Sequence, residues 1–463
     1  MRIIYYLLIF FCENAFFYSK LKKFNRLFSS YTPSKYRVMI QCTSPFWVMA
    51  TSHLVAKKLS LHSKSFDLFK LYFVNQFFEK TNKKAAVERN GQTLFLCGMF
   101  PSIFHGGGLR VRDIFSFLNK KHPVNVICPY EKIAENEIEA IESIGIELNV
   151  CRERKDILSQ ANLFLSNHDS ANVFFEWLQS SEWLAFVSAK HRKIYTFMEC
   201  STLSLYQDCQ RILSAGNYEK HREYFKKLVS VFSFEEFAAR NCDQMIAVNQ
   251  PDAAFIEHLF DKNALVVPTG VSLDFVQESS TVRQVPENQF NVGFLGYYWH
   301  YPNVDGVLWY LNRIHPYVKD LVPNYQFKIY GRGPIEKYLG AFSRDPQIEV
   351  VGEVDSIPEA FEAVDVAVAP LINGAGIRGK VNQYVAMKKA VVGTPLSMAG
   401  LPYQNMRDVF VESSPYSFAE RIVELLENSE KRKQLANSAF DQMERYVQCD
   451  STLKPIQDLI ERP

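Results

Sequence analysis

Residues 370–395 read PLINGAGIRGKVNQYVAMKKAVVGTP, and the order of elements in this stretch decides the fold class. The apolar run VDVAVAP leads into a loop with Gly374, Ala375 and Gly376, and a helical pattern and a second apolar run, AVVGTP, follow. Glycine-rich backbone can turn its N–H groups toward a ligand, and the start of a helix adds the positive end of its dipole. Such a loop predicts an anionic ligand, most simply a phosphate.

Two cations accompany this loop. Arg378 can hold phosphate oxygens in a bidentate fork, and Lys380 can add a point charge. Because positions two apart do not share a helix face, Arg378 must lie at the junction of loop and helix if both bind one diphosphate. Gln383 does share a face with Lys380 and can reach a neighbouring hydroxyl, such as that of a ribose. The alternative is a strand–helix turn without a ligand, with both cations solvated.

The same alternation of strands and helices extends outward in two blocks. The first starts at residue 93, with expected strands in TLFLCGMFP, VNVICP, ANLFLSNHD, RKIYTFMEC and DQMIAVN. The second has them in FNVGFLGYYW, YQFKIYGRGP, IEVVGEV, VDVAVAP and AVVGTP. Strands that alternate with helices predict parallel sheets, so we expect α/β domains at residues 89–285 and 286–463. Ligands of such sheets bind beyond the carboxyl ends of the strands, which places the site between the domains.

The bulk composition limits the class of protein. With 463 residues the chain is too long for one core, and its hydrophobic fraction of 47% is ordinary for a globular protein. Since 52 Lys and Arg oppose 50 Asp and Glu, the net charge is only +2, which argues against nucleic acid as a partner. The nine cysteines are dispersed and form no CxxC pair, so they indicate neither a zinc site nor a redox dithiol, and they favour the cytoplasm.

An N-terminal extension, residues 1–88, precedes the two blocks and carries no recognisable motif. Its apolar residues 3–12 are too few to span a bilayer, and no secretory cleavage site follows. A basic cluster comes next: Lys20, Lys22, Lys23 and Arg26. Aromatic and aliphatic residues followed by basic ones suit peripheral contact with the anionic inner face of a membrane. The alternative is a helix docked on the protein's own core.

Four motifs together resemble the GT-B glycosyltransferases of the large retaining family called group 1 or family 4. They are PLINGAGIRGKVNQYVAMKKAVVGTPLSMAGL from residue 370, VGFLGYYWHYPNVDGVLWYLNRI from residue 292, IYGRGP from residue 329 and VVPTGVSLDFV from residue 266. The resemblance covers roughly residues 93–445. It implies two Rossmann-like α/β domains that face each other across a cleft.

The resemblance implies that a nucleotide-diphosphate sugar is the co-substrate, held mainly by the C-terminal domain, and that no other cofactor is needed. The loop and both cations would meet its diphosphate, and Gln383, where the family carries a glutamate, would meet its ribose. The glycine loop HGGGLR of the N-terminal domain would lie near the same phosphates. The predicted nucleotide-sugar-binding residues are Gly106, Gly107, Gly108, Gly331, Gly333, Gly374, Ala375, Gly376, Arg378, Lys380 and Gln383.

Glu199 and His168 are the catalytic candidates of the N-terminal domain. Glu199 follows the expected strand in IYTFMEC, where many family members carry a histidine, and His168 ends the expected strand in LFLSNHDS. Each can hydrogen-bond a sugar hydroxyl or have a structural role only. Arg378 and Lys380 complete the catalytic set, since they would stabilise the leaving diphosphate. No Asp-x-Asp motif accompanies the donor loop, so no metal ion is expected.

The resulting expectation is a cytoplasmic, hexosyltransferase-like enzyme of glycan, polysaccharide or glycolipid synthesis. It would move a sugar from the nucleotide donor to an acceptor hydroxyl with retention of configuration. Two donor-site glutamates of the family are missing, because residues 373–376 contain no carboxylate and position 383 is an amide. A catalytically inactive GT-B-like binding partner of an active transferase is therefore the alternative. A nucleotide-sugar 2-epimerase of the same fold is a third interpretation.

Overall fold

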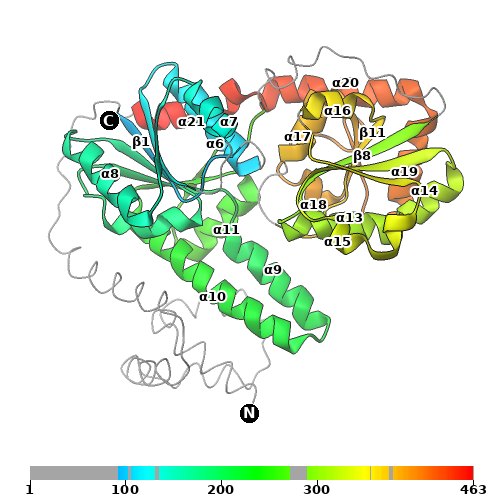
Figure 1. Ribbon diagram of the computed structural model, residues 1–463, viewed down its shortest axis with the longest axis horizontal. Coiled ribbons are helices and arrows are strands. Elements are labelled where there is room, and N and C mark those ends of the chain that lie inside the picture. The colour runs from blue at the N-terminus through cyan, green and yellow to red at the C-terminus, as the bar shows by residue number, and fades with distance from the viewer. Residues whose placement is uncertain are drawn as a thin grey trace.

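The computed structural model describes residues 92–102, 106–130, 135–271, 289–354, 356–374 and 379–461. The predicted extension at residues 1–88 lies outside this part of the chain. The described residues form two parallel β-sheets, each covered by helices, that lie side by side (Figure 1). The predicted class, α/β with two Rossmann-like domains, is confirmed.

The first sheet has parallel strands in the order β3-β2-β1-β4-β5-β6-β7. The strands are β1 (Thr93–Cys97), β2 (Val124–Pro129), β3 (Glu147–Cys151), β4 (Asn172–Glu176), β5 (Arg192–Phe197), β6 (Gln244–Ala247) and β7 (Ala264–Val266). The helices are α6 (Gly106–Asn119), α7 (Glu135–Glu142), α8 (Arg154–Ser166), η2 (Leu178–Ala185), α9 (Ser201–Ser214), α10 (Tyr218–Asn241) and α11 (Gln250–Phe260). The central strands β1 and β4 are buried along their whole length, as is typical of a sheet covered on both faces.

The segment ANLFLS, expected to be a strand, is instead the second half of α8, so that prediction is wrong. Ile157, Ala161 and Leu165 are buried at a spacing of four residues, whereas Leu163 is exposed. This spacing matches one face of a helix and not the alternation of a strand. The next strand, β4, is the run NVFFE that follows.

The second sheet is also parallel, in the order β10-β9-β8-β11-β12-β13. Its strands are β8 (Phe290–Tyr297), β9 (Tyr325–Arg332), β10 (Ile348–Gly352), β11 (Val366–Ala369), β12 (Ala390–Gly393) and β13 (Phe410–Val411). Its helices are α13 (Tyr301–Arg313), α14 (His315–Leu321), α15 (Glu336–Leu339), η3 (Gly340–Arg344), α16 (Ile357–Glu362), α17 (Gly379–Ala386), α18 (Pro395–Met398), α19 (Pro415–Glu427) and α20 (Ser429–Tyr446). The five strands expected in this block all form, and the short edge strand β13 adds to them.

The chain passes between the two domains twice, at adjacent points. Val271, after β7, forms a parallel bridge with Gln448, after α20, and its N–H donates to Val447 O at 3.0 Å. Helix α21 (Cys449–Glu461) then packs on the first domain, where Leu453 and Ile456 are buried against the face that carries α6. Figure 1 shows α20 and α21 running along one side of both domains. Two adjacent crossings form a single line about which the domains can turn.

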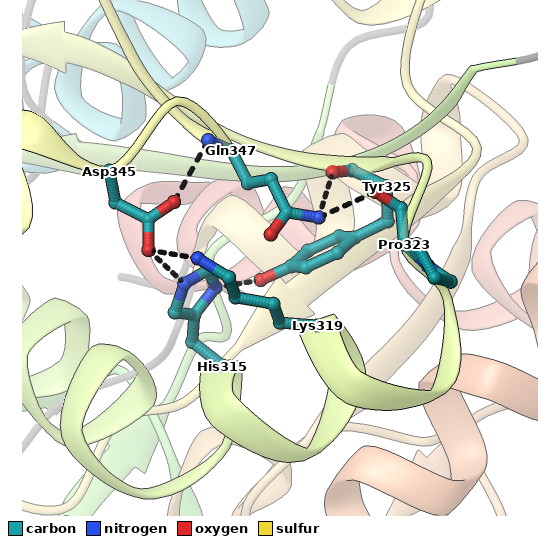
Figure 2. Close-up of polar contacts among 6 residues, drawn as sticks. All are labelled: His315, Lys319, Pro323, Tyr325, Asp345 and Gln347. Atoms are coloured by element: carbon teal, nitrogen blue, oxygen red, sulfur yellow. Dashed lines mark hydrogen bonds and ion pairs between the residues drawn. The ribbon is translucent and has the colours of Figure 1, made fainter.

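A polar cluster closes the amino edge of the second sheet, opposite the carboxyl ends of its strands (Figure 2). The His315 ring contacts the Tyr325 hydroxyl through Nδ1 and lies 3.2 Å from Asp345 Oδ2 through Nε2. Lys319 Nζ donates to the same oxygen at 2.7 Å, and the Gln347 N–H donates to Asp345 Oδ1 at 3.0 Å. Burial favours the neutral acid, but these donors outweigh it and lower the pKa of Asp345 to about 2. The cluster fastens α14 to the start of β10 and takes no part in the site below.

Candidate active site

Each sheet has one point at which the connections leave in opposite directions. In the first sheet this point lies between β1 and β4, and in the second between β8 and β11. Ligands of open parallel sheets bind beyond the carboxyl ends of the strands at such points. The predicted glycine loops follow β1 and β11, so each of them borders one of the two expected ligand crevices.

Contacts between the domains come from these carboxyl edges. Asn382, on α17, donates through Nδ2 to the carbonyl oxygen of Thr269, after β7, at 3.2 Å. Arg211, on α9 of the first domain, lies 3.6 Å from Asp305 on α13 of the second. The carboxyl edges of the two sheets therefore face each other, which is the arrangement that a ligand shared by both domains requires.

The loop after β11 has the backbone geometry of a glycine turn. Gly374 adopts a φ of +105°, a region in which a side chain would be strained. Helix α17 is described from Gly379 onward, so its first turn starts at the end of this loop. Ala375, Gly376 and Arg378 lie outside the described residues, and their contacts with a donor stay predictions.

Lys380 lies in the first turn of α17 and reaches the end of β8. Its Nζ donates to Asn303 Oδ1 at 2.5 Å and stands 4.2 Å from the centroid of the Phe294 ring. Asn303 is itself held in place, because its Nδ2 donates to Tyr297 O at 2.8 Å. A half-buried ammonium group thus lies over an aromatic ring at the crevice of the second sheet. It is a counter-charge in position for an anionic ligand.

Gln383 lies one turn after Lys380 on the same helix and is half-buried. Its side chain makes no hydrogen bond within the described part of the chain, and its predicted contact with a ribose is untested. Gly331 and Gly333, at the end of β9, have φ values of +112° and +121°. A Cβ atom at Gly331 would lie 1.9 Å from Gly296 O, so the close approach of β9 to β8 requires glycine there without any ligand.

The glycine loop of the first domain forms the start of α6. Gly106 is exposed, and a Cβ atom there would meet nothing within 4 Å, so the helix N-terminus is open at this residue. Gly107 is half-buried, and Gly108 is buried. A Cβ atom at Gly108 would lie 1.9 Å from Ser102 O, which explains this glycine by packing alone. Contact of the loop with a donor remains a prediction.

The crevice of the first sheet contains a buried carboxyl group, in the field of Arg110, that the sequence prediction missed. Glu176 ends β4 with no exposed surface, and its Oε1 accepts a hydrogen bond from Thr196 Oγ1 at 2.8 Å. Burial raises the pKa of Glu176 to about 7, although the charge of Arg110 opposes the shift. Arg110, on α6, donates through Nη1 to Pro268 O at 2.8 Å. In the sequence, the sign of this buried carboxyl group is the glutamate that ends the apolar run NVFFE.

The two catalytic candidates of the first domain lie at opposite edges of its sheet. Glu199 follows β5 at the carboxyl edge and is half-buried. His168 follows α8 and precedes β4, so the expectation that it ends a strand is wrong. Its ring packs on Phe164 with centroids 4.4 Å apart, and Lys190 Nζ donates to its carbonyl oxygen at 3.1 Å. The structure brings Glu199, but not His168, to the edge that faces the second domain.

The N-terminus of α9, beside Glu199, is already capped by a carboxyl group of the protein. Glu235, from α10, accepts the Ser201 N–H at 2.8 Å and the Thr202 N–H at 3.2 Å. Burial raises the pKa of Glu235 to about 7, against the effect of these hydrogen bonds. This helix end is therefore satisfied within the protein.

The described residues offer neither a cluster of metal ligands nor a membrane-spanning helix. No group of three or more His, Cys, Asp or Glu side chains in this part of the chain is arranged to hold a metal ion. None of the described helices combines the length and the apolar character that crossing a membrane requires.

Known structures share this architecture. Sucrose-phosphate synthase from Thermosynechococcus elongatus superposes with a TM-score of 0.61 at 12% identity, over 80% of this chain and 98% of that one. A TarM variant from S. aureus superposes with a TM-score of 0.59 at 10% identity, over 80% of this chain and 100% of that one. HepE from Anabaena superposes with a TM-score of 0.57 at 11% identity, over 80% of this chain and 99% of that one. At these identities the comparison shows a common fold, which is the predicted GT-B fold.

Sequence comparison identifies the second domain. An uncharacterized 44.6 kDa protein in the cps region of Klebsiella pneumoniae is 24% identical over 157 residues, which are 32% of this chain and 40% of the relative. The family model of the glycosyl transferases group 1 matches residues 289–428, which run from β8 through α19 and include the loop after β11 and Lys380. The resemblance to the glycosyl transferases group 1 is thereby confirmed for residues 289–428, within a chain that has the GT-B fold.

Proposed function

We propose that the chain is a glycosyltransferase that moves a sugar from a nucleotide-diphosphate donor to an acceptor hydroxyl. One observation carries the proposal: Lys380 lies in the first turn of α17, beside the turn at Gly374, at the crevice of the second sheet that faces the first domain. A fixed cation and a helix N-terminus at one point form a site for a diphosphate. Gly376 and Arg378, in the same loop, would complete it.

Relatives of the same fold support this donor class. HepE has been solved with UDP-glucose, and the TarM variant with UDP, alpha-GlcNAc-glycerol and Fondaparinux. Lys380 approaches from the second domain, so the diphosphate would lie on that side of the crevice and the sugar would extend toward the first domain. Gly331 and Gly333 border the same edge, as do residues 106–108 on the other side.

The reaction that fits this geometry breaks the bond between the anomeric carbon and the diphosphate oxygen. Lys380 and the N-terminus of α17 would stabilise the charge that develops on the departing oxygen. The acceptor oxygen would form the new bond from the same face, which retains the configuration, and its proton would pass to the departing phosphate oxygen. Turning of the domains about the double crossing at Val271 and Gln448 would exclude water.

The acceptor would bind the first domain, at the carboxyl edge that carries Glu199. We propose a glycan, polysaccharide or glycolipid, and a cytoplasmic protein in peripheral contact with a membrane. The basic cluster Lys20, Lys22, Lys23 and Arg26, next to an aromatic segment, supports that contact.

Titration of the purified protein with UDP, UDP-glucose and UDP-N-acetylglucosamine, followed by assays of donor hydrolysis and transfer, tests the proposal. We expect Lys380→Met to weaken donor binding roughly ten- to hundredfold, because it removes a charge-assisted hydrogen bond. Lys388→Met is the matched control, since this lysine also covers a phenylalanine ring, Phe440, at 4.5 Å. Undiminished binding by Lys380→Met would contradict the proposed site. Donor binding without any turnover would favour the inactive binding partner instead.

A further inference from the structure

A polar cluster joins the two domains next to the donor loop. Asp305, in the second turn of α13, accepts through Oδ2 a hydrogen bond from Asn373 Nδ2 at 2.6 Å. Arg211, from α9 of the first domain, places Nη2 3.6 Å from the same oxygen. Arg211 is also fixed on its own helix, since the same atom lies 2.9 Å from Asp208 Oδ1. Asn373 directly precedes Gly374, so the cluster borders the turn that would hold the diphosphate.

Two acceptor oxygens of this cluster have no donor. The amide of Asn373 is oriented by its bond to the carboxylate, because only Nδ2 can donate there. Asn373 Oδ1 therefore points away from Asp305. Asn373 is only 9% exposed, and its Oδ1 is buried without a hydrogen-bond partner in the described part of the chain. Asp305 is 26% exposed, and the described residues place no hydrogen bond on its Oδ1. A buried acceptor such as Asn373 Oδ1 normally has a donor.

The chemistry of these acceptors selects one part of the donor. A carboxylate repels a diphosphate, so Asp305 does not bind phosphate oxygens. It accepts hydrogen bonds from hydroxyl groups, as does an amide oxygen. Since Arg211 ties Asp305 to the first domain, Asp305 lies on the side of the loop from which the acceptor would approach. This is where the sugar of the donor must lie, rather than its nucleoside.

We propose that Asp305 binds hydroxyl groups of the donor's sugar, with Asn373 Oδ1 as a second acceptor and Arg211 as a positioning residue. The inference rests on the proposed function and adds the residues that select the sugar. Arg211 belongs to the first domain and Asp305 to the second, so this subsite is complete only when the domains are in contact. Recognition of the sugar is then coupled to the closed arrangement in which transfer takes place.

Calorimetric titrations with UDP and UDP-glucose test the assignment. Asp305→Asn keeps the size of the side chain and an acceptor for Asn373, but it removes the charge. We expect it to weaken UDP-glucose binding at least tenfold and to leave UDP binding unchanged or tighter, because a charge that repels the diphosphate is lost. Glu427→Gln, which removes an exposed carboxylate at the end of α19, is the control and should change neither. The proposal would be overturned if Asp305→Asn weakened the binding of UDP and UDP-glucose equally, or weakened the binding of neither.

Kinetics with the same donor test the role of Arg211. We expect Arg211→Ala to raise KM for the donor at least fivefold with a smaller change in kcat, and Arg211→Lys to restore most of the loss. A positioning role would be refuted if Arg211→Ala lowered stability without raising KM more than it changes kcat, or if Arg211→Lys did not restore the loss. If the unaltered protein binds UDP-glucose and Asp305→Asn binds it equally well, only this inference fails. If the unaltered protein binds neither UDP nor UDP-glucose nor UDP-N-acetylglucosamine, the proposed function fails with it.

Discussion

Replacing Glu176 by glutamine removes a carboxylate that has no exposed surface. The amide can still accept the hydrogen bond of Thr196 and has nearly the same volume, so packing at the end of β4 should persist. What changes is the proton equilibrium. In the folded protein the pKa of Glu176 is about 7, whereas the ordinary value of 4.5 applies to the unfolded chain.

The magnitude follows from this difference in pKa. Between pH 4.5 and 7 the folded state binds more protons at Glu176 than the unfolded state, so stability falls as the pH rises through this range and is constant above it. Each pKa unit corresponds to about 1.4 kcal/mol, which gives a cost of about 3 kcal/mol for the ionised group at pH 8. Glutamine mimics the protonated form. The variant should therefore match the natural protein near pH 5 and exceed it by up to about 3 kcal/mol at pH 8.

Reversible urea unfolding of the intact protein, measured at several values between pH 5 and 8, gives the difference in free energy of unfolding between variant and natural protein. Taking the difference cancels the titration of all other groups. Glu427→Gln, at an exposed position, should show no pH-dependent difference. A difference for Glu176→Gln that does not change with pH would refute the claim that this carboxyl titrates near neutrality. A loss of stability at pH 8 would mean that pairing with Arg110 outweighs burial.

Two further changes probe the second domain. Gly331→Ala should destabilise the second domain by about 3 kcal/mol or more, because φ at this position is +112° and the new Cβ would lie 1.9 Å from Gly296 O. Thermal unfolding should show a lower Tm for this domain. An unchanged Tm would contradict the geometry. Asp345→Asn should cost about 1 kcal/mol at pH 7, since the pair with Lys319 is partly screened by solvent. Because the pKa of Asp345 is lowered to about 2, this contribution is present above about pH 4 and is lost as the pH falls through 2, so acid titrations of variant and natural protein should converge there.

The sequence was sufficient where local pattern and packing agree. The run VAVA of β11 is apolar at every position because the strand lies inside a parallel sheet and is covered on both faces, and the turn at Gly374 and helix α17 follow it. The placement of Lys380 at the start of α17 also followed from spacing alone. The fold class and the turn and helix after β11 were therefore predictable from short-range information.

The rest depends on contacts between distant residues. Leu163 reads as part of an apolar run, and only packing shows that it is exposed while Ile157 and Leu165 are buried. Asp305 and Arg211 are 94 positions apart (305 − 211) and meet only because the domains face each other. No local pattern marks such a pair, since each residue looks like an ordinary solvated charge on an amphipathic helix. For this reason the sequence prediction found no carboxylate at the proposed donor site, while the structure places Asp305 beside the turn at Gly374.

The two crevices are connected through the segment that leaves the first sheet. Arg110 binds Pro268 O from the helix that carries the first glycine loop, and Asn382 binds Thr269 O from the helix that carries Lys380. Adjacent carbonyl groups of one segment are thus held by both domains. A displacement of α17 must therefore either break the bond to Thr269 or pull on the residue that Arg110 holds. Because Arg110 is buried beside Glu176, its own position is firm, and movement of the domains should pivot at residues 268–271 rather than deform either sheet.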